Sequence, residues 1–162
     1  MTIRYCLRCA SPLKKINYTH YVCANGHDFW NNPKATVCIV IEKDGMFLAA
    51  ERAESPHKGK FQLPGGFVDH GENAESAIVR EVTEETGLTL HTVELLTSVA
   101  HDFTENVGLC DIVFFSNDWS GTPTPSDDVA SLQWKPLTFI NSAEWAWDFR
   151  NVPEAINKRL QT

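Results

Sequence analysis

Residues 66–88 read GFVDHGENAESAIVREVTEETGL, and this stretch decides the fold. Its second half predicts a helix whose last two turns carry Glu81, Glu84 and Glu85. A carboxylate near the negative end of a helix dipole costs about 0.3–1 kcal/mol, and like charges three or four residues apart add to that cost. A requirement other than helix stability must therefore explain the three glutamates.

The glutamates do not lie opposite the apolar side of the helix. At about 100° per residue, the apolar stripe contains Glu81 and Glu85, and Glu84 lies at its edge. The apolar members of the stripe are Ala74, Ala77, Ile78 and Val82. Burial of unpaired charge is costly, so cations are needed, and oxygen ligands on a rigid helix favour Mg²⁺ or Mn²⁺ acting on phosphate oxygens. The alternative is a solvated acidic face without a metal.

The spacing around this helix resembles the Nudix box, G-x5-E-x7-R-E-U-x-E-E-x-G-U, in which U is an apolar residue. Every defined position agrees across residues 66–88. The matching residues are Gly66, Glu72, Arg80, Glu81, Val82, Glu84, Glu85, Gly87 and Leu88. The preceding residues 61–66, FQLPGG, are also similar to the approach to the box in that family.

The resemblance implies an α/β fold, the Nudix α/β/α sandwich with a mixed sheet. It also implies that Glu81, Glu84 and Glu85 hold Mg²⁺ or Mn²⁺ for hydrolysis of a phosphorus anhydride. A further catalytic carboxylate is expected from a loop before a late strand that contains Trp. Asp128, six residues before Trp134, is the best candidate, followed by Asp127.

The same resemblance assigns roles to the loop before the helix. Gly65 and Gly66 would shape the cofactor-binding site, with the backbone carbonyl of Gly65 assisting the metals. Arg80 and Glu72 would pair and hold the loop against the helix.

The N-terminal segment predicts a second metal site. Cys6 and Cys9 are followed after thirteen residues by Cys23 and then by His27. Three thiolates and one imidazole suit tetrahedral zinc, and a metal would supply folding free energy that so short a segment lacks. The alternative is that Cys6 and Cys9 are free thiols and His27 is a surface residue.

Charge separates the same two parts of the chain. Residues 1–34 are net basic, whereas the whole chain of 162 residues has a formal net charge of −7. We expect a zinc ribbon over residues 1–32 and a Nudix domain over 33–162, with the turn at Asn31-Asn32-Pro33 as the boundary. Attraction between the two parts accounts for the asymmetry, so a nucleic-acid partner is not expected.

The remaining pattern predicts strands and one further helix. The expected strands are 36–41, 46–50, 94–100, 109–116 and 132–136. A helix is expected over residues 142–160 with an interruption near Pro153. Cys38 and Cys110 lie in apolar runs and are expected to be core residues.

No apolar run is long enough to span a bilayer, and the start of the chain lacks a signal-peptide core, so we expect a cytoplasmic protein with a small nucleotide substrate and no membrane partner. The sequence is compatible with a homodimer.

A zinc ribbon joined to a Nudix domain is similar to the ADP-ribose, FAD and NADH pyrophosphatase groups. Residues 98–104, SVAHDFT, depart from the stretch that is typical of the NADH group. The ribbon also departs from its family pattern at Cys23 and His27, where a second C-x-x-C is usual.

Five aromatic residues could stack on a base, although such residues are more often core: Phe103, Trp119, Trp145, Trp147 and Phe149. Two other functions stay open. One is a nucleotide-binding sensor without hydrolysis, and the other is a hydrolase of RNA 5′ ends.

Overall fold

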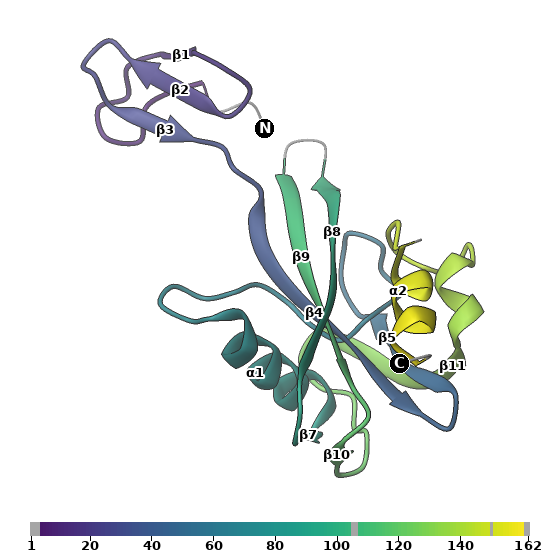
Figure 1. The fold of residues 1–162 in the computed structure, drawn as a ribbon. Helices are drawn as coiled ribbons and strands as arrows, with labels where there is room; N and C mark the ends of the chain where they lie inside the picture. Colours follow the sequence, from purple (N-terminus) through teal and green to yellow (C-terminus); the bar gives the residue numbers. More distant parts are fainter. Residues whose placement is uncertain (1–3, 105–106, 150, 161–162) are drawn as a thin grey trace.

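The fold was analysed in a computed structural model that describes residues 4–104, 107–149 and 151–160. Its centre is a mixed sheet with the strand order β11-β5-β4-β9-β8 (Figure 1). The short strand β6 pairs with β5. β4 and β9 run parallel, whereas the other pairs in this sheet are antiparallel. The strands are β4 (Lys34–Lys43), β5 (Met46–Arg52), β6 (Phe61–Gln62), β8 (Glu94–Thr104), β9 (Val107–Ser116) and β11 (Val129–Pro136).

Two helices cover opposite faces of the sheet, α1 (Ala74–Thr86) and α2 (Asn151–Leu160). Side chains alternate between the faces of a strand, so β4 contributes to both hydrophobic cores. Val37 and Ile39 pack in the cluster that contains the apolar stripe of α1, whereas Cys38 and Val40 pack in the cluster with Val152 and Ile156 of α2. The predicted α/β/α sandwich with a mixed sheet is confirmed.

The ends of α1 follow from its sequence. The Asn73 side chain accepts a hydrogen bond from the Ser76 N–H at 2.8 Å. Gly87 adopts a left-handed conformation with φ of 67°, and its N–H donates to the Thr83 carbonyl. These caps fix where the helix begins and ends.

The N-terminal segment forms a separate three-stranded antiparallel sheet, β1 (Leu13–Lys15), β2 (His20–Cys23) and β3 (Asp28–Trp30). It projects from the start of β4 rather than lying over either helix (Figure 1). A short pairing of β7 (Thr89–Leu90) with β10 (Trp119–Ser120) closes the opposite end of the domain.

Two expectations were wrong. Cys110 is exposed, because at this part of β9 the neighbouring Leu109 and Asp111 face the interior instead. The expected helix over 142–160 is confined to α2, and a 3-10 helix (Leu137–Asn141) precedes it. Pro153 does not interrupt α2, because it lies in the first turn, where its missing N–H is not needed. Cys38 is a buried core residue, as predicted.

Candidate active site

Of the three glutamates in the last two turns of α1, two face inward. Glu81 is 9% exposed and Glu85 is 2% exposed, whereas the Glu84 side chain is half exposed. This is the arrangement that the helical periodicity predicts, and it places two carboxylates against the sheet without a basic residue in the last turn of α1.

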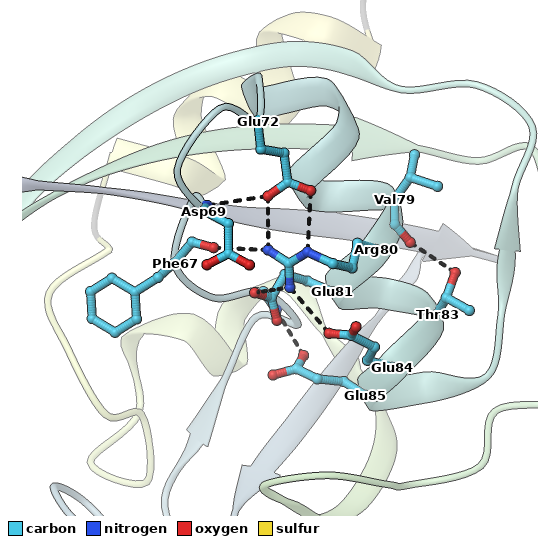
Figure 2. Close-up of polar contacts among 10 residues, drawn as sticks. Phe67, Asp69, Glu72, Val79, Arg80, Glu81, Thr83, Glu84 and Glu85 are labelled. Atoms are coloured by element: carbon cyan, nitrogen blue, oxygen red, sulfur yellow. Dashed lines mark hydrogen bonds and ion pairs between the residues drawn. The ribbon is translucent and has the colours of Figure 1, made fainter.

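Arg80 connects the glutamates to the preceding loop (Figure 2). Its guanidinium donates to both carboxylate oxygens of Glu72, at 3.1 and 3.0 Å, and to the Phe67 carbonyl at 3.0 Å. It also donates to Glu81 at 2.8 Å and to Glu84 at 3.1 Å. Arg80 therefore holds the loop against α1 and provides positive charge beside two of the three glutamates.

The surroundings of Glu81 and Glu85 disfavour their ionised forms. Burial raises the pKa of Glu85 well above its usual value, and the nearby charges of Asp128, Glu81 and Asp127 act in the same direction. Burial likewise raises the pKa of Glu81, although Arg80 opposes the shift. A cation bound among these oxygens would relieve this repulsion, so the donor set fits a hard divalent ion.

Gly65 and Gly66 bring backbone close to the glutamates. The Gly65 N–H donates to Glu85 at 2.8 Å. N–H groups of β4 donate hydrogen bonds to the carbonyls of Pro64 and Gly66. The Gly65 carbonyl takes no part in this pairing. A Cβ on Gly65, which has φ of 143°, would lie 2.1 Å from the Val37 carbonyl oxygen, so a side chain does not fit.

The loop before β11 brings Asp127 and Asp128 to the glutamates. Its Ser126 N–H donates to the Glu85 carbonyl at 3.1 Å, and the Asp128 carbonyl accepts from the Ala53 N–H at 2.8 Å. Both aspartates line the same cavity as Glu81 and Glu85. Asp128 is half-buried and Asp127 is exposed, so the structure places both sequence candidates at this site.

The cavity has a volume of about 300 Å³. Its acidic residues come from α1, the loop before α1, β9 and the loop before β11, and the other lining residues come from β4, β5, β6, β8, β9, the loop before α1 and residues 147–149. The lining includes Gly65, Gly66, Phe67, Asp69, Glu81, Glu85, Asp127 and Asp128, together with Thr36, Arg52, Gln62, His101, Phe103, Leu109, Asp111, Trp147 and Phe149.

Arg52 is a cavity residue that the sequence analysis missed. It is 7% exposed and donates to the Pro56 carbonyl at 2.7 Å and to Gln62 at 2.5 Å. Its guanidinium lies 4.8 Å from the centroid of the Trp147 ring. Burial lowers the pKa of Arg52, and the charges of Asp128 and Glu85 oppose that shift. The sequence signal that could have identified this residue is an arginine at the end of an apolar strand.

Three of the five candidate aromatic residues line the cavity, namely Phe103, Trp147 and Phe149. The other two have different surroundings. Trp119 stacks on Trp134 and donates to the Glu42 carbonyl. Trp145 packs against Phe47, Phe139 and Phe149 in the core.

The part of the chain that forms this cavity matches a known protein family. The chain matches the family model described as the NUDIX domain over residues 31–155. The chain belongs to the Nudix family. The resemblance drawn from residues 66–88 is therefore confirmed, and the protein is a Nudix hydrolase.

Individual relatives of this Nudix hydrolase differ in their named substrates. It is 35% identical over 122 residues to an ADP-ribose pyrophosphatase of Methanocaldococcus jannaschii, covering 75% of this chain and 71% of the relative. It is 33% identical over 126 residues to an oxidized purine nucleoside triphosphate hydrolase of Mus musculus, covering 76% and 80%. Among solved structures, the MutT protein of Methanosarcina mazei Go1 superposes with a TM-score of 0.71 at 25% identity, covering 81% and 98%.

The N-terminal sheet of the Nudix hydrolase gathers the four predicted zinc ligands. The ligand atoms of Cys6, Cys9, Cys23 and His27 all lie within 4.8 Å of one another. Cys9 Sγ and Cys23 Sγ are 3.8 Å apart, too far for a disulfide, and Cys6 Sγ is 3.5 Å from His27 Nδ1. Ideal tetrahedral zinc would give about 3.8 Å between two sulfurs and about 3.6 Å between sulfur and nitrogen. The donor set therefore fits zinc in type and in spacing.

In the part of the chain that the structure describes, no helix has the length and apolar character needed to cross a membrane.

Proposed function

We propose that this Nudix hydrolase cleaves the pyrophosphate bond of a nucleoside diphosphate linked to another moiety, of the ADP-ribose, FAD or NAD(H) class. Glu81, Glu84 and Glu85 hold Mg²⁺ or Mn²⁺ in this proposal, with the Gly65 carbonyl as a further ligand. The ADP-ribose pyrophosphatase among the relatives supports this class of substrate.

One observation carries the proposal: Glu81 and Glu85 are buried together beside a cavity, at a site where their ionised forms are disfavoured without a cation. A bound divalent ion would polarise the diphosphate and activate a water that attacks phosphorus. Structural ion-pair networks also shift pKa values, but such networks do not require a cavity of substrate size.

Other residues of the chain can bind phosphate and accept a proton. Arg52 faces the cavity with a guanidinium that is fixed by Gln62 and the Pro56 carbonyl, so it can bind a phosphate without reorganising. Asp128 and Asp127 can accept the proton of the attacking water, with Asp128 as the more enclosed of the two.

A panel of nucleoside diphosphate derivatives with Mg²⁺ or Mn²⁺ tests the reaction. Glu84→Gln and Glu85→Gln remove ligand charge while keeping side-chain shape, so turnover should be lost in proteins that remain folded. Glu75→Gln, at an exposed position in the first turn of the same helix, is the matched control and should retain activity. Turnover that persists in both folded ligand variants would refute the metal assignment.

The mouse relative favours a second candidate, hydrolysis of a modified purine nucleoside triphosphate. The same cavity could hold a triphosphate, because Arg52 and the carboxylate site recognise phosphate rather than the group beyond it. Including oxidised and unmodified purine triphosphates in the panel separates the two candidates by their kcat/KM values.

We also propose that residues 1–32 form a zinc ribbon and residues 33–162 the hydrolase domain. Cys6, Cys9, Cys23 and His27 would bind one structural zinc. β3 ends at Trp30 and β4 begins at Lys34, on either side of this boundary.

A further inference from the structure

The guanidinium of Arg52 has hydrogen-bond donors to spare. Its Nε donates to the Pro56 carbonyl at 2.7 Å, and its Nη1 donates to Gln62 Oε1 at 2.5 Å. Its Nη2 has no hydrogen-bond partner among the residues that the structure describes. Because Arg52 lines the cavity, these remaining donors are available to an anionic ligand there.

Nearby carboxylates attract the same guanidinium. Asp128 and Glu85 line the cavity with Arg52, and their negative charges raise its pKa against the effect of burial. Even so, within the described residues no ion pair joins Arg52 to either carboxylate. Such an ion pair would occupy both the arginine and a carboxylate of the site, so the guanidinium has to be held in its present position.

The ring of Trp147 provides a restraint in addition to the two hydrogen bonds. Arg52 Cζ lies over this ring, 4.8 Å from its centroid. A guanidinium stacks well on an aromatic ring because it is planar and weakly hydrated, and the attraction is strongest where water is excluded. Arg52 is 7% exposed, so this condition is met. Stacking limits the rotation of the guanidinium that the bonds to Gln62 and Pro56 still allow.

Trp147 is itself held by other rings. The centroid of its ring lies 5.2 Å from that of His57, 5.3 Å from that of His101 and 6.0 Å from that of Phe103. Its Nε1 has no hydrogen-bond partner in the described part of the chain. Ring contacts, rather than a hydrogen bond, therefore fix the indole.

Backbone pairing brings the partners of the arginine together. Two hydrogen bonds of 2.8 and 2.9 Å join Phe61 in β6 to Glu144 and Ala146. Gln62 is the next residue of β6, and Trp147 is the next residue after Ala146. β6 also pairs with β5, whose last residue is the arginine. Three neighbouring segments thus supply the guanidinium, its hydrogen-bond acceptor and its stacking ring.

We propose that Trp147 is a positioning residue, whose ring holds the Arg52 guanidinium toward the cavity and away from Asp128 and Glu85. Arg52 then stays free to bind a phosphate of the substrate. The phosphate-binding role rests on the proposed function, whereas the restraint of the arginine does not. If Trp147 acts through Arg52, its replacement should matter only while the arginine is present.

Two variants of Trp147 test this dependence. Trp147→Leu removes the aromatic ring, whereas Trp147→Phe keeps one and loses no hydrogen bond. With the best diphosphate substrate, kcat/KM should fall about tenfold in Trp147→Leu and less than about threefold in Trp147→Phe. When Arg52→Ala is already present, adding Trp147→Leu should change kcat/KM less than about twofold.

Trp134→Leu is the matched control. Trp134 is half-buried and has Lys43 Nζ 5.8 Å from its ring centroid, but it does not line the cavity. This variant should keep the wild-type kcat/KM, and melting curves establish that each variant is folded.

NMR of the arginine side chains gives a readout that needs neither metal nor hydrolysis. In the metal-free wild type, the Nε–H of Arg52 should give a resolved signal that the ring current of Trp147 displaces from the usual position. Its absence in Arg52→Ala identifies this signal. The displacement should remain in Trp147→Phe and disappear in Trp147→Leu.

Equal losses of kcat/KM from Trp147→Leu with and without Arg52 would overturn the inference, because a purely structural role does not depend on the arginine. An undisplaced Nε–H signal in the wild type would also overturn it, and this measurement needs no variant of Trp147. A displaced signal in a protein that hydrolyses none of the tested diphosphates would uphold the restraint and refute the proposed function.

Discussion

The guanidinium of Arg80 and the carboxylate of Glu72 meet through two parallel hydrogen bonds, at 3.0 and 3.1 Å, across the loop that leads into α1. The same arginine reaches Glu81 and Glu84, so the position of the loop and the positions of the proposed metal ligands depend on one side chain. Glu72 also accepts from the Asp69 N–H, which fixes the loop at a second point.

Replacement of Glu72 by Gln should therefore lower kcat or metal affinity roughly 10–100-fold, the usual effect of losing a group that orients metal ligands. The fold should remain, because Glu72 is only partly buried and belongs to neither hydrophobic core cluster. Steady-state kinetics at several Mg²⁺ concentrations measure the effect, with Glu75→Gln as the control. Wild-type metal dependence in Glu72→Gln would show that the pair has no positioning role.

Glu85→Gln should be more stable than the wild type when no divalent ion is present. The pKa of Glu85 is raised in the folded state. Its contribution to stability is therefore fully present below the usual pKa of 4.5, and it is lost as the pH rises through the folded-state pKa. The glutamine amide does not ionise, so this loss does not occur in the variant. We expect the free energy of unfolding of Glu85→Gln to exceed that of the wild type by roughly 1–3 kcal/mol at neutral pH.

Melting temperatures between pH 5 and 8 without divalent ions check this prediction. Wild-type stability should fall as pH rises, Glu85→Gln should show a flatter profile, and added Mg²⁺ should stabilise the wild type alone. Identical pH profiles for the two proteins would contradict the argument.

Gly65 and Gly66 should respond differently to alanine. At Gly65 the new Cβ meets the Val37 backbone, which cannot move without breaking the pairing of β4 with β9, so Gly65→Ala should lose more than about 2 kcal/mol of stability. At Gly66 the Cβ would lie 2.6 Å from the Glu81 carboxylate, a flexible side chain that can swing away. Gly66→Ala should therefore keep near-native stability and lose activity.

Denaturant unfolding and kinetics on both glycine variants measure these effects. Comparable stability losses at the two positions would mean that Glu81 is as rigidly held as the backbone of β4.

Elemental analysis should find one zinc per chain in protein purified without chelator. Cys23→Ser should abolish it, because three remaining ligands bind zinc much more weakly than four. Cys110→Ser is the control, because Cys110 lies outside the cluster and is exposed. A folded N-terminal sheet that contains no metal would disprove the zinc assignment.

The parts of the structure that local sequence determines were predictable. The helical period correctly predicted that Glu81 and Glu85 face inward. The predicted strands were correct in location but short, because hydrogen bonding extends β4 and β8 beyond their apolar residues.

The parts that depend on pairing between distant segments were not predictable. His101 and Asp111 become partners only because β8 and β9 form a hairpin, and Arg52 reaches Gln62 across a strand pair. Cys110 lies in an apolar run of the sequence, but the tertiary arrangement decides which face of β9 is buried at that position.

The parallel pairing of β4 with β9 has a consequence for synthesis of the protein. Residues 37–41 of β4 are all apolar and supply both cores, yet α1 and β8 both lie between β4 and β9 in the chain. During translation residues 4–30 leave the ribosome before β4 and can fold around a metal, whereas β4 remains without its parallel neighbour until most of the domain has been made. The nascent chain is therefore exposed to aggregation at its most hydrophobic strand, and a chaperone that binds extended apolar segments should contact β4 before any other part of the enzyme.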